Sequence, residues 1–153
     1  MIEATTRDVA RFWSKVDKSG DCWLWIAGKD SKGYGIFSQR SKAVAAHRFA
    51  YRLEYGPIPD GMMVDHKCHA SDCVRPTHLR AATRKQNGEN RKGAQRNSKS
   101  GVRGVCWYKG KWFTGVKHEG KSYYVGSYDD IADAEAAVVA KRNELFSHNQ
   151  EKA

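Results

Sequence analysis

The sequence predicts an α+β protein built from two small parts, and three observations lead to this prediction. Residues 1–90 alternate helical and strand-like segments around a loop rich in cysteine and histidine. Residues 91–101 are polar and basic and contain no large apolar side chain, which is typical of a linker. Residues 102–153 contain three strand-like segments and then a helical one, which predicts a three-stranded antiparallel sheet packed on one helix.

The first predicted element is a short helix within residues 5–17. Strands are then predicted in residues 20–28 and in the segment "GYGIF", because both are rich in strand formers and the turn "KDSKG" separates them. The helix is indicated by apolar residues at helical spacing, namely Val9, Phe12, Trp13 and Val16.

A second helix is predicted over residues 42–56, "KAVAAHRFAYRLEYG", followed by the turn "GPIPDG". Pro fixes φ and Gly permits positive φ, so this turn ends the helix. The segment "MMVDH" predicts a short strand that leads into the cysteine- and histidine-rich loop. Thr83 is a plausible N-cap for a third helix over residues 84–92.

In the C-terminal part, three strands joined by glycine turns are predicted within residues 101–130. A helix is predicted over residues 129–146, with Asp129 or Asp130 as its N-cap. Its apolar stripe consists of Ile131, Ala134, Val138 and Leu145.

The charge of the chain indicates its partners. The formal net charge is +10, and such an excess favours binding to polyanions. No apolar run approaches the roughly 18 residues of a membrane-spanning helix, and no basic amphipathic helix stands out, so we expect no membrane partner. The N-terminal segment "MIEATTRDVARFWSKV" is too polar for a signal peptide, and we therefore expect an intracellular protein.

Two cysteines and a histidine have the spacing Cys68-x4-Cys73-x4-His78 on one tight loop. Zinc prefers four such ligands in a tetrahedron, and Cys22 is the cysteine in the first part that can complete the set. A zinc ion held this way would staple a small domain together, because its binding energy becomes folding energy. The alternative is reduced, buried cysteines beside a solvated histidine, and His69 is a competing ligand.

His66 is left over by the zinc set and stands next to Asp65, with Asn87 in the helix that follows. Phosphodiester hydrolysis needs a base to activate water and a Lewis acid to neutralise charge on the phosphate. A carboxylate and an amide oxygen are hard ligands that suit magnesium. The alternative is a structural role, in which His66 is a hydrogen-bonded core histidine paired with Asp65.

The motifs "CWLW", "GYGIF", "AAHRFAY", "GPIPDG", "VDHKC", "CVRPTHL" and "TRKQN" occur in this order within residues 8–92. This region resembles the HNH endonucleases of phages and mobile introns. It also resembles the His-Cys box homing endonucleases, which share with them the ββα-metal (His-Me finger) core. The resemblance implies a zinc-stapled ββα-metal nuclease core.

By this resemblance His66 is the general base and Asn87 binds the catalytic metal, Mg²⁺ or Mn²⁺, with Asp65 as a further ligand. The structural zinc of the His-Cys box members falls on Cys22, Cys68, Cys73 and His78. The relatives commonly have Asn-Pro where this chain has Arg75-Pro76, and that Asn braces the loop. Arg75 is therefore a candidate for contact with a phosphate.

Arg48, in "AAHRFAY", can either stabilise the leaving group of the reaction or remain a solvated helix residue. Its neighbour His47 is expected to pack between the helix and the core.

Basic residues dominate the segment from Arg75 to Lys111, which contains eleven Lys or Arg and the single acid Glu89. Such a stripe gives salt-sensitive affinity for nucleic acid, although a solvated linker would explain residues 91–101 alone. The predicted DNA-binding residues are Arg75, Arg84, Lys85, Arg91, Lys92, Arg96, Arg103, Trp107, Lys109, Lys111 and Lys117.

Residues 100–146 resemble the DNA-binding domain of the plant Apetala and ethylene-response-factor class, in the order "GV", "KW", "GK", "GSY" and "AEAA". The resemblance implies that the sheet docks in the major groove of duplex DNA. Several arginines usual in the plant domains are absent, for example at Cys106, so no base preference carries over.

Together these features predict a metal-dependent DNA endonuclease of the homing type, encoded by a phage or an intron and acting on duplex DNA in the host cytoplasm. A monomer would nick one strand, and a symmetric homodimer would cut both. One alternative is a non-catalytic, sequence-specific DNA-binding regulator that retains an HNH scaffold. The other is an RNA-binding protein, because a basic aromatic sheet also suits single strands.

Overall fold

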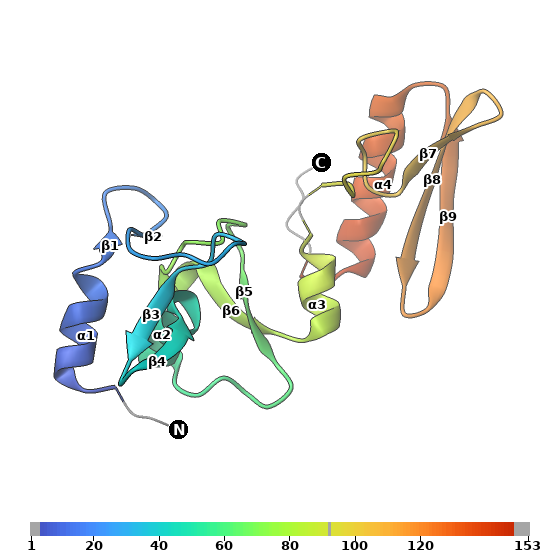
Figure 1. Ribbon diagram of the computed structural model, residues 1–153. Coiled ribbons are helices and arrows are strands. Elements are labelled where there is room, and N and C mark those ends of the chain that lie inside the picture. The colour runs from blue at the N-terminus through green and yellow to red at the C-terminus, as the bar shows by residue number, and fades with distance from the viewer. Residues whose placement is uncertain (1–3, 92, 149–153) are drawn as a thin grey trace. The chain divides into compact units, whose positions relative to one another are not determined.

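The computed structural model of the protein describes residues 4–91 and 93–148 (Figure 1). It divides into two compact units, the first ending at Arg84 and the second beginning at Lys85. The boundaries predicted from the sequence, at residues 90 and 101, are not tested by this division and stay predictions. Within the described residues, every helix is too short or too polar to cross a membrane.

The first unit contains three two-stranded antiparallel sheets and two α-helices. The strands pair as β1 with β2, β3 with β4, and β5 with β6. In chain order the elements are α1 (Thr6–Trp13), β1 (Val16–Asp17), β2 (Leu24–Trp25), β3 (Ile36–Gln39), β4 (Lys42–Ala45), α2 (Ala46–Tyr55), β5 (Met63–His66), the 3-10 helix η1 (Pro76–His78) and β6 (Leu79–Ala82).

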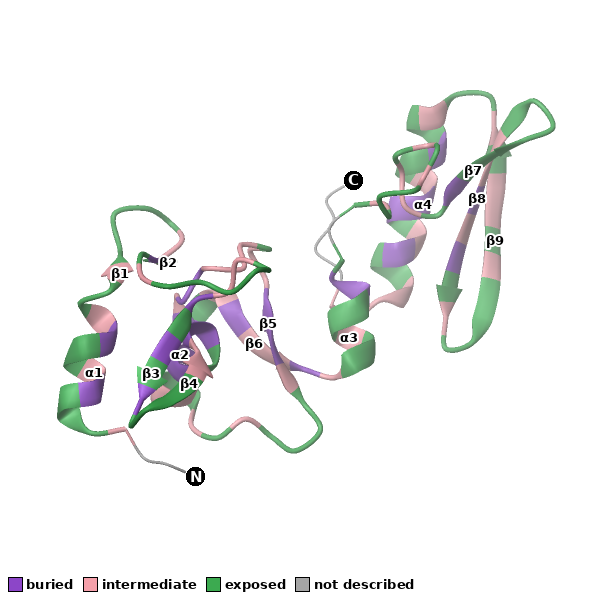
Figure 2. Ribbon diagram, in the orientation of Figure 1, coloured by how far each residue is buried: buried purple, intermediate pink, exposed green. Residues whose placement is uncertain are grey.

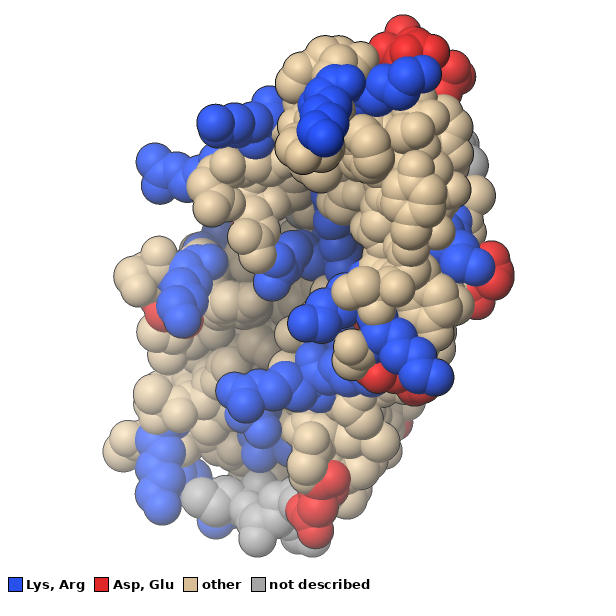
Figure 3. All heavy atoms as spheres, turned by 90° about the vertical axis from the view of Figure 1, so that its right-hand side faces the viewer, with Lys and Arg blue, Asp and Glu red and all other residues tan. Residues whose placement is uncertain are grey.

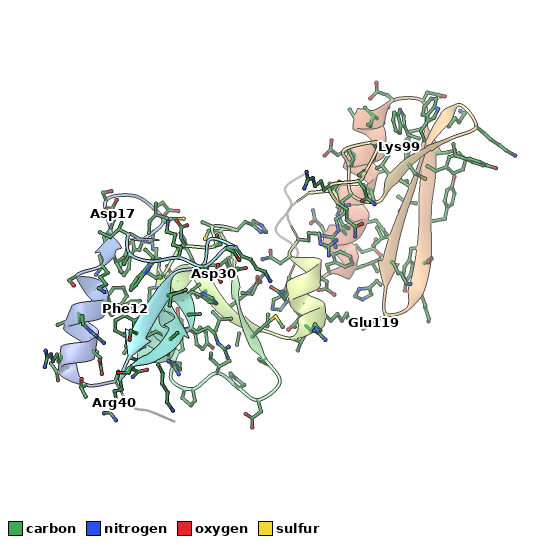
Figure 4. All side chains as sticks on the ribbon, viewed as in Figure 1. Phe12, Asp17, Asp30, Arg40, Lys99 and Glu119 are labelled. Atoms are coloured by element: carbon green, nitrogen blue, oxygen red, sulfur yellow. The ribbon has the colours of Figure 1, made fainter. Side chains whose placement is uncertain are left out.

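Aromatic side chains form the core of the first unit, between α1, the β3–β4 hairpin and α2 (Figure 2). Phe12 points from α1 into this core (Figure 4), with its ring centroid 4.8 Å from that of Phe49 and 5.3 Å from that of Phe37. The N-terminus of α1 is fixed by a capping box between Thr5 and Asp8. Such buried aromatic pairs stabilise a small core efficiently.

The helix predicted over residues 42–56 begins only at Ala46, because Lys42–Ala45 form β4. Gln39 pairs with Lys42, so the hairpin turn consists of Arg40 and Ser41 alone. Both turn residues have positive φ, at 47° and 62°, as the two-residue turns that match the twist of a hairpin require. The prediction was wrong here because a hairpin contact across the chain outweighed the local helical pattern.

The strand pair β5–β6 was predicted only in its first half. Residues 63–66 form β5 as expected from "MMVDH", whereas β6, with the sequence "LRAA", carries no strand signal. The pairing of His66 with Leu79 places β6 directly opposite β5. The ends of the cysteine- and histidine-rich loop therefore lie side by side.

The second unit is a three-stranded antiparallel sheet in the order β7-β8-β9 with α4 packed against it (Figure 1). The α+β class and this sheet-and-helix arrangement agree with the sequence-based prediction. Asp130 Oδ1 accepts a hydrogen bond of 2.6 Å from the Ala132 amide and caps α4. The elements are α3 (Arg84–Glu89), which starts at the boundary, β7 (Val105–Tyr108), β8 (Lys111–His118), β9 (Lys121–Tyr128) and α4 (Ile131–Leu145).

Gly35 permits the close approach of its backbone to the fully buried Trp25 ring. A Cβ atom at Gly35 would lie 2.6 Å from Trp25 Cγ and 3.0 Å from Ala46 Cβ. We expect Gly35→Ala to lower the free energy of unfolding by about 1–3 kcal/mol, because the core cannot absorb the methyl group. Urea denaturation measures this change.

Gly28→Ala is the matched control, because a Cβ atom at Gly28 meets nothing within 4 Å. We expect its free energy of unfolding to stay within about 0.5 kcal/mol of the parent. Equal effects of the two substitutions would contradict the packing of Gly35 on Trp25.

Candidate metal centre and catalytic residues

Four potential metal ligands from distant parts of the first unit converge on one point. The ligand atoms of Cys22, Cys68, Cys73 and His78 all lie within 4.8 Å of one another. Cys22 precedes β2, the other cysteines lie in the loop after β5, and His78 ends η1. The set predicted from the sequence is therefore assembled, and His69, the competing candidate, is not part of the group.

The distances within the group suit zinc. His78 Nδ1 lies 3.6 Å from Cys22 Sγ and 3.7 Å from Cys73 Sγ. A tetrahedral zinc ion with ordinary bond lengths separates its ligand atoms by about 3.6–3.8 Å. Three sulfurs and one imidazole nitrogen are also the donors that zinc prefers. The Cys3His group can therefore hold a zinc ion.

Asp21 orients the histidine of this group. Its Oδ2 lies 3.5 Å from His78 Nε2, on the opposite side of the ring from the two sulfurs. A carboxylate at this nitrogen favours a proton on Nε2, which leaves the lone pair on Nδ1 facing the cysteines. Carboxylates that fix metal-binding histidines in this way raise metal affinity.

Arg75 braces the same corner of the structure. Its Nη1 donates hydrogen bonds to the Asp21 carbonyl oxygen at 2.6 Å and to Asp21 Oδ1 at 2.5 Å. Arg75 therefore fixes Asp21, the residue next to Cys22, and so braces the segment that leads to the metal group. This use of the guanidinium differs from the phosphate contact proposed from the sequence.

Burial favours the protonated thiols of Cys73 and Cys22 in the absence of a cation. It raises the pKa of Cys73 to about 12, and it also raises the pKa of Cys22, with the nearby Cys68 as a further cause. A bound cation would reverse this preference by attracting the thiolates. Metal binding at this group is therefore coupled to the release of protons.

His66 is buried at the end of β5 and is anchored by its ring. Its Nε2 lies 2.9 Å from the backbone carbonyl oxygen of Cys73. A carbonyl only accepts, so the proton of the neutral ring is on Nε2 and the basic lone pair is on Nδ1. Burial lowers the pKa of His66 below 6.5, against the opposing effects of the Cys73 carbonyl and of Asp65. The ring is consequently neutral and able to accept a proton at neutral pH.

Asp65 precedes His66 and is also buried. Its Oδ2 accepts a hydrogen bond of 3.0 Å from Nε of Arg80, which is its cross-strand partner on β6. This ion pair holds the carboxylate in one orientation at the end of the β5–β6 hairpin.

Two aromatic side chains that the sequence reasoning did not assign to the site pack around His66. The His66 ring centroid lies 4.8 Å from that of His47 and 5.9 Å from that of Tyr34. The loop that presents Tyr34 is shaped by Asp30, whose Oδ1 accepts from the backbone amide of Tyr34 at 2.9 Å. Tyr34 belongs to the motif "GYGIF", but the residue pattern of this motif indicated only a strand and gave no sign of a contact with His66.

His47 is buried, as expected from the sequence, with its side chain against the His66 ring instead of in solvent. Burial and the neighbouring His66 and Arg48 lower its pKa to about 3. His47 therefore stays neutral and packs as an uncharged wall beside His66.

The remaining predicted catalytic residues are exposed. Arg48 lies in the first turn of α2, next to His47. Asn87 lies on α3, in the second unit. The metal-binding role of Asn87 and the leaving-group role of Arg48 stay predictions of the sequence.

Basic side chains are spread over the face shown in Figure 3, with acidic ones mostly near its margins. Lys92 lies outside the described residues. Arg75 and Arg103 are engaged in hydrogen bonds to the protein itself. The other predicted DNA-binding residues are exposed, namely Arg84, Lys85, Arg91, Arg96, Trp107, Lys109, Lys111 and Lys117.

The sheet separates the predicted contacts of the second unit onto two faces. Trp107 pairs with Trp112, which packs on the core beside α4, so Trp107 belongs to the helix-side face. Lys111 pairs with Tyr108, and Lys117 pairs with Ser122, on the opposite face.

That opposite face, which we call the outer face, also carries a row of aromatic rings. The ring centroids of Tyr108 and Phe113 lie 5.7 Å apart, and those of Phe113 and Tyr124 lie 6.2 Å apart. Tyr124 is 68% exposed and Tyr108 is 56% exposed. The outer face therefore combines lysines with unburied aromatic rings.

Comparisons with known proteins support the nuclease resemblance over the middle of the chain. Residues 44–89 match the HNH endonuclease family. Over 70 residues the chain is 41% identical to "Protein 7.7" of Escherichia phage T7, a match that covers 46% of this chain and 54% of the phage protein. The chain thus spans about half the length of that relative. No solved structure matches the chain.

The family match includes Arg48, Asp65, His66, two of the zinc-site cysteines, His78 and Asn87. It does not extend to the sheet of the second unit. The resemblance of residues 100–146 to the Apetala and ethylene-response-factor class gains no support and carries no further argument.

Substitution of one cysteine in the group tests the metal centre. We expect Cys73→Ser to abolish zinc binding and to lower the melting temperature, because binding energy at such a site is folding energy. Metal analysis of the purified protein and calorimetry measure the two effects.

Cys106→Ser is the matched control, because Cys106 is exposed on the sheet of the second unit. It should retain one zinc ion per chain and the parent melting temperature. Zinc in the Cys73→Ser protein at the parent stoichiometry would contradict the site.

Arg75→Ala tests the brace on Asp21. We expect about a 10-fold loss of zinc affinity, because Asp21 then orients His78 less firmly. Competition with a chromophoric chelator measures the affinity. An unchanged zinc affinity together with weakened DNA binding would instead assign Arg75 to a phosphate.

Proposed function

We propose that this chain is a metal-dependent DNA endonuclease of the homing type, which hydrolyses a phosphodiester bond of duplex DNA at a preferred site. One observation carries the proposal: the buried ring of His66 is anchored through Nε2 on the Cys73 carbonyl. This anchor keeps a neutral imidazole with its basic nitrogen defined, inside the segment that matches the HNH endonuclease family.

His66 acts as the general base. Its Nδ1 takes a proton from a water molecule as the water oxygen bonds to phosphorus, and the bond from phosphorus to the 3′-oxygen breaks. The anchored Nε2–H and the walls of His47 and Tyr34 keep the ring from rotating away from the water. Such positioning lowers the entropic part of the barrier.

A catalytic Mg²⁺ or Mn²⁺ would be held by Asp65 and Asn87. The carboxylate and the amide provide hard oxygen donors, which these ions prefer. When bound, the ion supplies charge neutralisation at the phosphate and at the leaving oxygen. Asp65 is already oriented by Arg80, and in this proposal Arg48 offers its guanidinium to a phosphate oxygen.

The outer face of the second unit is the DNA-docking surface in this proposal. Lys111 and Lys117 lie on this face, and Lys109 lies in the adjoining turn. Their charges favour a polyanion and predict salt-sensitive affinity. Trp107, on the other face, is not included.

Replacing the base tests the reaction. We expect His66→Ala to lower nicking of supercoiled plasmid at least about 100-fold, with zinc content and DNA affinity unchanged. Parent protein treated with EDTA at a concentration that removes Mg²⁺ should be equally inactive.

His69→Asn is the control, because His69 is an exposed histidine of the same loop, and asparagine tolerates its φ of 58°. It should nick at the parent rate. If the parent protein binds duplex DNA tightly and never cuts it with Mg²⁺ or Mn²⁺, the endonuclease proposal is wrong and the chain is a DNA-binding regulator.

A further inference from the structure

The short helix α3 is held by residues of the second unit. It has six residues, Arg84–Glu89, which is too short to be stable by itself in water. The contacts that stabilise it therefore determine where its exposed side chains, Asn87 among them, are placed.

Arg103 binds the C-terminal end of α3. Its guanidinium donates to the carbonyl oxygens of Glu89 at 2.9 Å, Arg91 at 3.2 Å and Gly88 at 3.3 Å. The last carbonyls of a helix lack partners within the helix and carry partial negative charge. A planar guanidinium with several donors satisfies two of them, at Gly88 and Glu89, together with the Arg91 carbonyl just past the helix.

Arg103 is itself fixed by α4 and the segment that follows it. Its guanidinium carbon lies 5.4 Å from the centroid of the Phe146 ring. Its carbonyl oxygen accepts a hydrogen bond from the buried Arg142. Gly104, next in sequence, has a φ of 81°, and a Cβ atom there would lie 2.6 Å from the Gly115 carbonyl oxygen. The backbone at Arg103 therefore has little freedom to move.

Glu89 forms the second attachment of α3. It is 5% exposed, and its Oε1 lies 3.6 Å from His118 Nδ1 on β8. Ser147 Oγ donates to its Oε2 at 3.3 Å.

On the adjoining turn, Glu119 reaches Lys85 of α3, with a distance of 2.8 Å between Oε1 and Nζ (Figure 4). Both ends of α3 are thus tied to the β8–β9 hairpin or to α4.

We propose that Arg103 and Glu89 are positioning residues, which place α3 and its Asn87 by attaching them to the C-terminal sheet and helix. The inference rests on the proposed function, because Asn87 is assigned there as a ligand of the catalytic metal. Arg103 then acts through α3 and not through contact with DNA.

Arg103→Ala and Arg103→Lys in the full chain test this proposal by two readouts. The first is hydrogen exchange of the backbone amides of residues 84–91, which needs no activity. We expect faster exchange there in Arg103→Ala, with residues 4–80 unchanged. Arg103→Lys should lie between Arg103→Ala and the parent, because an ammonium group cannot reach three carbonyls in one plane.

The second readout is the Mg²⁺ concentration for half-maximal nicking. We expect about a 10-fold increase in Arg103→Ala, at unchanged DNA affinity. Glu89→Gln keeps the shape of the side chain and should shift both readouts in the same direction as Arg103→Ala. It replaces Arg103→Ala in the test if that variant fails to fold. Arg7→Ala, an exposed arginine of α1, is the control and should leave both at parent values.

Unchanged exchange over residues 84–91 in both Arg103→Ala and Glu89→Gln would overturn the proposal. A second pattern would also overturn it: Arg103→Ala loses DNA affinity, its affinity depends less steeply on salt by about one unit of slope, and the amide exchange of residues 84–91 is unchanged. That pattern marks a contact of Arg103 with a phosphate. If the parent protein fails to cut DNA, the endonuclease proposal falls, while the exchange readout still decides whether Arg103 and Glu89 position α3.

Discussion

The rest of the first unit depends on Cys73, which makes one contact through its side chain and another through its backbone. Its thiol belongs to the Cys3His group, and its carbonyl oxygen holds the ring of His66. The backbone around it is tied to β2, because the amide of Val74 donates to the Trp23 carbonyl at 2.7 Å and that of Trp25 donates to the Asp72 carbonyl at 2.9 Å. A metal ion at the thiol would therefore fix the position of the carbonyl, and through it the ring that we propose as the base.

A closed metal group would compensate for the small amount of apolar side chain that this part of the first unit can bury. The aromatic core lies between α1, the β3–β4 hairpin and α2, and the long loop from Lys67 to Arg75 has few apolar side chains to bury. A metal ion bound by Cys22, Cys68, Cys73 and His78 would restrain this loop instead. The hydrogen bonds of Arg75 to Asp21 add a further link between the loop and the segment before β2.

The sequence predicted those parts of the molecule whose signals are local or chemically restrictive. The metal set was predictable because few residue types bind zinc tightly and their spacing fitted one site. The three C-terminal strands and α4 were predictable from turns, alternation and the Asp130 cap. Contacts between distant segments were not predictable, so β6 was missed and α2 was started four residues too early. The first helix was likewise predicted to run to residue 17, whereas α1 ends at Trp13 and Val16–Asp17 form β1, paired with β2. For the same reason the packing of Tyr34 and His47 on His66, and the attachment of Arg75 to Asp21 and of Arg103 to α3, were not foreseen.

The Cys73 carbonyl selects the His66 tautomer that has its lone pair on Nδ1. Nitrogen NMR of protein labelled with ¹⁵N-histidine, loaded with zinc at neutral pH, tests it directly. We expect a protonated Nε2 and an unprotonated Nδ1 for His66. A proton on Nδ1, or rapid exchange between both tautomers in the zinc-loaded protein, would contradict it.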